Sequence, residues 1–203
     1  MRASGIVTAL PDFAFAAVFL ITWLSPAAFG AQTVNRLLLV MLLEFISIHS
    51  AAFMGTVAVR PAVPWRRALG IAGLGVFYSL FAGAFALIFR TWWPLGAFWL
   101  QTGNRLLGVL GGRSTGSEQA FLKASWLASV LLYILCCFAT SFLPLPALGI
   151  TPAVIERLHL PGSGLWISAP YRVLAFGVLY YALTAWWELV GPRWLERRGS
   201  GQS

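Results

Sequence analysis

The sequence predicts an all-α membrane protein, a polytopic bundle of about six transmembrane helices with one short interfacial helix between the last two. Of its 203 residues, 59% are hydrophobic and only 10% are charged, whereas a soluble domain carries about 25% charged residues. The mean hydropathy is +0.80. Apolar stretches run from Ile6 almost to Val190 with no polar block long enough to fold alone, so we expect one transmembrane domain over residues 1–203.

The spans follow from the length of each apolar stretch, because a helix needs about 20 residues to cross the hydrocarbon. The first stretch, with Pro11 and Asp12 near its entry, could also be a signal peptide, since Arg2 precedes it and small residues follow near Ala28; we interpret it as a retained span. The clear spans are residues 6–24, 37–59, 68–89, 121–142 and 171–190.

The stretch 92–110 is ambiguous, because Gln101, Asn104 and Arg105 interrupt it and several glycines weaken it as a helix. It could span the membrane or re-enter on the same side. Six spans place ten of the fourteen Lys and Arg residues on one side, whereas a re-entrant segment divides them six to eight, and short cytoplasmic loops are rich in cations. We therefore expect six spans with both termini in the cytoplasm of a bacterium and the chain in its inner membrane. The ten cations are Arg2, Arg60, Arg66, Arg67, Arg105, Arg113, Lys123, Arg193, Arg197 and Arg198.

The longest connection is the outer loop, residues 144–170. A Thr151–Pro152 start and a Pro161–Gly162 stop predict one short helix of about two turns within it. Trp166 is suited to anchor this helix along the outer interface.

Small residues four apart let membrane helices approach closely. Two such stripes are predicted to face each other across the hairpin of the second and third spans: Ser47, Ala51 and Gly55, and Gly75, Ser79 and Gly83. At about 100° per residue, Glu44 lies within about 20° of Ala51 and Gly55, so its carboxyl group is expected to point into the bundle.

We single out Glu44 as an acid near the middle of a predicted span, with Asp12 assigned to the entry of the first, because ionisable groups within the membrane suggest a function. Its natural partner is Arg105, which shares a polar face with Gln101 and Asn104. Together they could form a proton relay or a cation pocket. The alternative is a neutral Glu44 hydrogen-bonded to a serine or threonine, with Arg105 reaching to the cytoplasmic headgroups.

His49 is the candidate for cofactor binding, since a neutral imidazole within a span can ligate haem, chlorin or a metal. It could equally form a hydrogen bond with a serine or a backbone carbonyl. No second ligand stands at metal-binding spacing, and adjacent Cys136 and Cys137 are expected to be reduced core residues. The sequence indicates no metal and no particular cofactor.

Three function classes are compatible with these features. The first is an accessory or scaffold subunit that packs against partner membrane proteins, which needs no catalytic residues. The second is a small transporter or channel that uses Glu44 and Arg105, and the third is an enzyme acting on lipids or quinones, which is disfavoured because no nucleophile and base can be assembled. The net charge of +8 does not indicate nucleic acid, since the cations flank apolar segments; the expected partners are membrane lipids and other membrane proteins.

Overall fold

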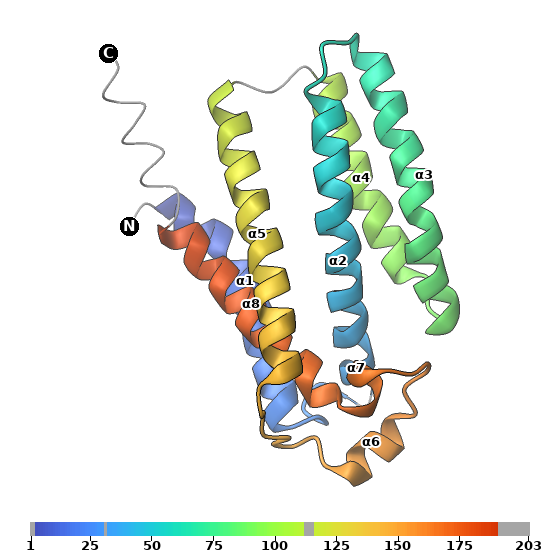
Figure 1. Cartoon of the computed structure of the whole chain (residues 1–203), viewed down its shortest axis with the longest axis vertical. Helices are drawn as coiled ribbons and strands as arrows, with labels where there is room; N and C mark the ends of the chain where they lie inside the picture. The colour runs from blue at the N-terminus through green and yellow to red at the C-terminus, as the bar shows by residue number, and fades with distance from the viewer. Residues whose placement is uncertain (1–2, 31, 112–115, 191–203) are drawn as a thin grey trace. The chain divides into compact units, whose positions relative to one another are not determined.

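The computed structural model describes residues 3–30, 32–111 and 116–190, with side chains placed from residue 6 and, after the second gap, from residue 124. In this part of the chain all regular structure is helical (Figure 1), which confirms the predicted all-α class. The helices are α1 (Ala3–Leu24), α2 (Thr33–Ala58), α3 (Pro64–Ile88), α4 (Trp93–Leu110), α5 (Gly116–Phe142), α6 (Pro152–Leu158), α7 (Leu165–Ser168) and α8 (Pro170–Val190).

Five of these helices, α1, α2, α3, α5 and α8, are long and apolar enough to cross a membrane. They match the five clear spans predicted from the sequence. The protein is thus a multipass integral membrane protein by the length and apolar composition of its helices. Arg2, Arg113 and the three arginines of residues 191–203, which were assigned to the cytoplasmic side, lie outside the described residues.

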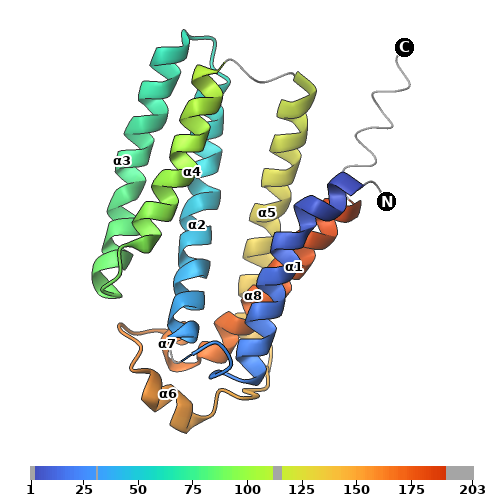
Figure 2. The same ribbon diagram turned by 180° about the vertical axis from the view of Figure 1, so that it is seen from behind.

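The ambiguous stretch forms α4, an uninterrupted helix of 18 residues and therefore about 27 Å long. It packs along α3, from which a turn at Arg90 separates it (Figures 1 and 2). Pro94 at the start of α4 is tolerated because the first turn of a helix has no partner for that backbone N–H. Because α4 is not among the five helices that are long and apolar enough to cross a membrane, its crossing stays a prediction.

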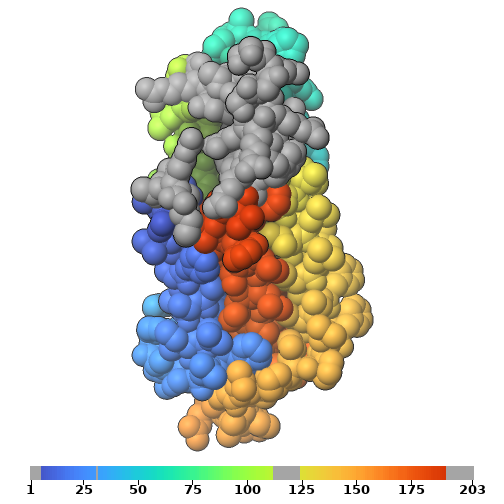
Figure 3. Space-filling model, turned by 90° about the vertical axis from the view of Figure 1, so that its left-hand side faces the viewer, coloured from blue at the N-terminus to red at the C-terminus, as the bar shows by residue number. Residues whose placement is uncertain are grey.

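The chain divides into two compact units, residues 1–38 with 127–203 and residues 39–126. In the first unit α8 lies between α1 and the later part of α5 (Figure 3). Phe19 of α1 packs directly on Gly177 of α8, which has no side chain to keep the helices apart. Tyr133 of α5 meets Phe176 of α8 edge to face with ring centroids 4.7 Å apart.

The outer loop closes the end of this unit. Trp23 Nε1 donates to the carbonyl of Pro146 at 3.2 Å, and Gly149 N donates to the carbonyl of Trp23 at 3.0 Å. The predicted short helix is α6, which begins after Thr151, whose hydroxyl accepts from Val154 N. It ends sooner than expected, because His159 adopts a left-handed conformation with φ 44°, and the single turn α7 follows.

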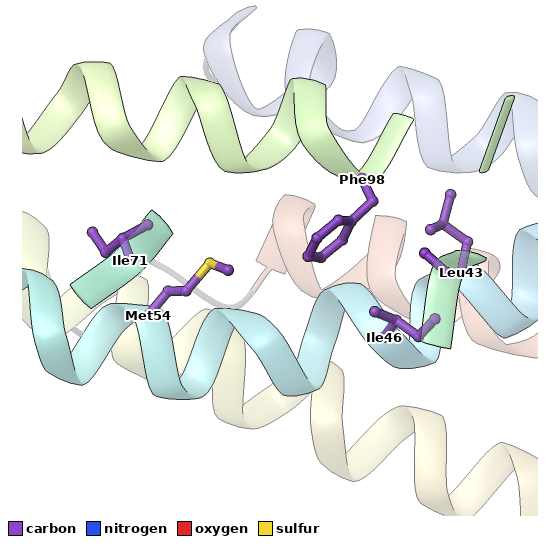
Figure 4. Packing of buried hydrophobic residues seen from close by; sticks show 6 residues of the cluster. Leu43, Ile46, Met54, Ile71 and Phe98 are labelled. Carbon is purple, nitrogen blue, oxygen red and sulfur yellow. The ribbon is translucent and has the colours of Figure 1, made fainter. Parts of the chain in front are cut away.

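In the second unit, α2, α3 and α4 share one core. Figure 4 shows Phe98 of α4 pointing toward side chains of α2. All of the core side chains are at most 8% exposed: Leu43, Ile46, Met54, Ile71, Ala82 and Phe98. From within α5, Trp126 Nε1 donates to the carbonyl of Ile48 on α2 at 3.0 Å.

The glycines of the two small-residue stripes do not meet each other, and the pairing of the remaining members stays a prediction. A Cβ atom at Gly75 would lie 3.1 Å from Thr102 Cγ2 and 3.2 Å from the Trp99 ring, so this glycine faces α4. A Cβ atom at Gly55 or Gly83 would have no neighbour within 4 Å. The physical reason is that the broad Trp99 side chain of α4 lies against Gly75, where a residue without a Cβ atom leaves room for the ring.

Candidate functional site

The second unit contains α4, which is more polar than α2 and α3, and the two sides of α4 differ sharply. Its buried side carries Pro94, Phe98 and Thr102, spaced four residues apart, which pack into the unit. This spacing keeps one side of a helix directed at its neighbours.

A second stripe on α4 begins at Ala97, which packs against the core of the unit, and continues over exposed residues. Ala97, Gln101, Asn104 and Gly108 are spaced four, three and four residues apart, which places them within about 60° of one another on the helix. We call these four residues the amide seam. Gln101, Asn104 and Gly108 are exposed and Ala97 is half-buried.

The carboxamides of the amide seam have no hydrogen-bond partner among the side chains and backbone groups that the structure describes. Neighbouring side chains on the same helix are apolar, and Leu100 and Leu107 are 78% and 71% exposed. The seam therefore presents two polar groups on an otherwise apolar, exposed surface of α4.

Arg105 lies between the amide seam and the buried side of α4. Its Nη1 donates to Ser50 Oγ at 3.3 Å and lies 3.4 Å from Met54 Sδ, both on α2. The Ser50 hydroxyl in turn donates to the carbonyl of Ser47 at 3.0 Å. A guanidinium group is thus tied to two completely buried α2 side chains at the depth of the membrane-length helices.

The predicted partner of Arg105, Glu44, is half-buried on α2. The α2 contacts of Arg105 lie six and ten residues from Glu44, which is a rise of about 9 and 15 Å along the helix. The structure thus brings Arg105, Gln101 and Asn104 together on one helix, and the pairing of Arg105 with Glu44 stays a prediction.

His49 is exposed on α2. Its Nδ1 lies 2.9 Å from the carbonyl of Phe45, and its ring packs on the Phe45 ring with centroids 4.0 Å apart. Because a carbonyl can only accept, Nδ1 is the donor in this contact. Among the described residues, no group of three His, Cys, Asp or Glu side chains could hold a metal ion.

A further polar cluster, which the sequence did not reveal, joins the first and last membrane-length helices. The side chain of Thr8 hydrogen-bonds to the Glu188 carboxyl group, and the charge of Asp12 acts on the same group. Thr8 and Asp12 are four residues apart, hence on one side of α1. The signal that could have found part of this cluster is the position of Asp12, six residues or about 9 Å inside the Ile6–Leu24 span.

Comparisons of the chain with protein-family models, with curated proteins and with solved structures found no match. An exposed pair of carboxamides can donate to and accept from a neighbouring protein, and the guanidinium of Arg105 can hold an anionic group.

Proposed function

We propose that the protein is an accessory or scaffold subunit of a larger membrane complex, in which a helix of a partner protein packs on the amide seam of α4. The observation that carries this proposal is the exposure of Gln101 and Asn104 on a helix packed along a membrane-length neighbour.

Lipid tails offer no hydrogen bonds, so an exposed carboxamide at membrane depth leaves one acceptor and two donors unsatisfied. Leaving such a group unpaired in an apolar medium costs roughly 2–7 kcal/mol. A partner helix with its own hydrogen-bonding side chains removes that cost, as is typical of polar residues at helix contacts in membranes.

The spacing of the amide seam supports a helical partner in particular. Intervals of four, three and four residues are those of a heptad contact line between two helices. Ala97 and Gly108 at its two ends are small, and a Cβ atom at Gly108 would have no neighbour within 4 Å. Small residues at both ends let the two backbones approach while the carboxamides pair between them.

The distribution of cations supports an orientation with both termini in the cytoplasm of a bacterium and the chain in its inner membrane. The short turn between α2 and α3 contains Arg60, and Arg66 and Arg67 follow at the start of α3. The turn between α3 and α4 contains a single cation, Arg90. Cytoplasmic loops carry such an excess of cations, so we place the α2–α3 turn on the cytoplasmic side.

Co-purification from native membranes tests the proposal. The double variant Gln101→Leu, Asn104→Leu should lose its stoichiometric partner, because each interhelical hydrogen bond contributes about 0.6–2 kcal/mol, or about three-fold to thirty-fold in affinity. The matched control is Thr56→Val, which also removes an exposed polar group; its hydroxyl already donates to the carbonyl of Phe53 at 2.7 Å and needs no partner. Equal recovery of the partner with both variants would contradict the proposal.

The Arg105 contacts favour a second candidate function, a small transporter or channel. A guanidinium group held by Ser50 and Met54, with the buried hydroxyl of Thr102 lacking a hydrogen-bond partner among the described atoms, could form part of a polar pathway. In that case Arg105→Gln and Glu44→Gln would each abolish ion flux in reconstituted vesicles while leaving co-purification intact. The scaffold function predicts the opposite pattern.

A further inference from the structure

The turn between α2 and α3 is short and firmly closed. It contains five residues, 59–63, between the end of α2 at Ala58 and the start of α3 at Pro64. Arg67 Nη1 donates to the carbonyl of Ala58 at 2.9 Å and so ties the beginning of α3 to the end of α2. Because both helices are long enough to span a membrane, the turn is held at the membrane surface.

Two cations of this turn are exposed and available. Arg60 lies within the turn and Arg66 lies in the first turn of α3, and both are exposed. The nearest acids along the chain are Glu44 and Glu118, so no carboxylate occurs between residues 45 and 117 to neutralise them locally. Among the residues whose side chains the structure describes, neither guanidinium group has an ion-pair partner, so both can meet an external anion.

Trp65 adds an apolar side chain beside Arg60 and Arg66. Its indole is 59% exposed, and the Arg66 guanidinium carbon lies 5.3 Å from the centre of the indole ring. Tryptophan favours the headgroup level of a bilayer, and a cation stacked on the ring stays close to that level. No side chain caps α3, so the positive end of its helix dipole adds to the field of the two cations.

We propose that Arg60, Trp65 and Arg66 form a binding site for the phosphate headgroup of an anionic phospholipid. Two exposed guanidinium groups suit the phosphate oxygens, which arginine binds in a bidentate manner. The exposed indole suits the glycerol and upper acyl region of the same molecule, which a free phosphate ion lacks. Arg67 acts as a positioning residue, because its guanidinium holds the turn closed.

Native mass spectrometry of the full-length protein in mild detergent tests this site. The probes are phosphatidylglycerol and phosphatidylcholine with identical acyl chains, titrated at low ionic strength. We expect the wild-type protein to bind phosphatidylglycerol preferentially. The variants Arg60→Gln and Arg66→Gln should each lower that affinity about five-fold, and the double variant about thirty-fold, as expected for cations near an anionic surface.

The matched control is the double variant Arg90→Gln, Arg157→Gln, which removes two exposed cations elsewhere and should leave the preference within two-fold. An equal loss in this control would show that binding follows net charge and would overturn the site. Displacement of the lipid by inorganic phosphate at matched concentration would overturn the lipid assignment, as would equal binding of the two lipids. The unfolding temperature of each variant is expected to equal that of the wild-type protein, which separates loss of binding from loss of fold. If the double variant does not fold, the two single variants still test the site.

Discussion

The contact between α1 and α8 depends on the absence of a side chain at Gly177. A Cβ atom at this position would lie closer than 3.0 Å to three carbons of the Phe19 ring. Phe19 is completely buried, and Tyr181 packs on it with ring centroids 5.7 Å apart, so the ring has no space to rotate away. Gly177→Ala should therefore force the two helices apart.

The magnitude follows from two opposing effects. Overpacking by one methyl group in a tight core costs about 1–3 kcal/mol, while replacing glycine by alanine within a helix gains up to about 1 kcal/mol. In the control Gly83→Ala only the gain in helix stability applies, since its Cβ atom would have no neighbour within 4 Å. We expect the two variants to differ by about 1–3 kcal/mol, or about 2–12 °C in Tm for a chain of this length.

Thermal unfolding in mild detergent, followed by circular dichroism, measures this difference. The second change Phe19→Leu should restore part of the stability lost in Gly177→Ala, because it removes ring atoms that the new methyl group meets. If Gly177→Ala and Gly83→Ala unfold at the same temperature, the close α1–α8 contact does not exist as described.

Three further substitutions test other contacts. Arg172→Gln should lower the free energy of unfolding by about 1.5–3 kcal/mol, because the Arg172 guanidinium donates to three backbone carbonyls at and just beyond the end of α5. The control Arg157→Gln removes an exposed cation and should change the same free energy by less than about 0.5 kcal/mol. Thermal unfolding of the two variants measures the difference. Trp126→Phe should cost about 0.5–1.5 kcal/mol by losing the bond to the Ile48 carbonyl, measured in the same way. His49→Ala should leave the unfolding free energy within about 0.5 kcal/mol, because the Nδ1 bond stays within α2; a larger loss in the same assay would show that the ring holds a neighbouring element.

Much of the fold could be predicted from apolar length alone, because hydrocarbon thickness fixes how long a spanning helix must be. The five clear spans and the short helix after Thr151 follow from that rule and from local capping signals. The helix over 93–110 is harder to predict as a span, because Gln101 and Asn104 lower its hydropathy although its backbone is regular.

The contacts between helices could not be predicted in the same way, because one helix offers several sides and the sequence does not say which neighbour each side meets. Gly75 belongs to a stripe expected to face α2, yet it meets the Trp99 side chain of α4. The cluster of Asp12 and Glu188 joins residues 176 positions apart, and only the packing of α1 on α8 brings them together. Such non-local pairing is invisible to periodicity.

The most direct test of the proposed scaffold function is site-specific photo-crosslinking in native membranes. A photoreactive residue at Leu100, which is 78% exposed and directly precedes Gln101 of the amide seam, should form a crosslink to a second polypeptide of defined mass. The same group at Leu80, which is 68% exposed on α3, should give none. Crosslinks from position 100 that stay within the chain or reach only lipid, or equal protein crosslinking from both positions, would contradict a partner helix on the amide seam.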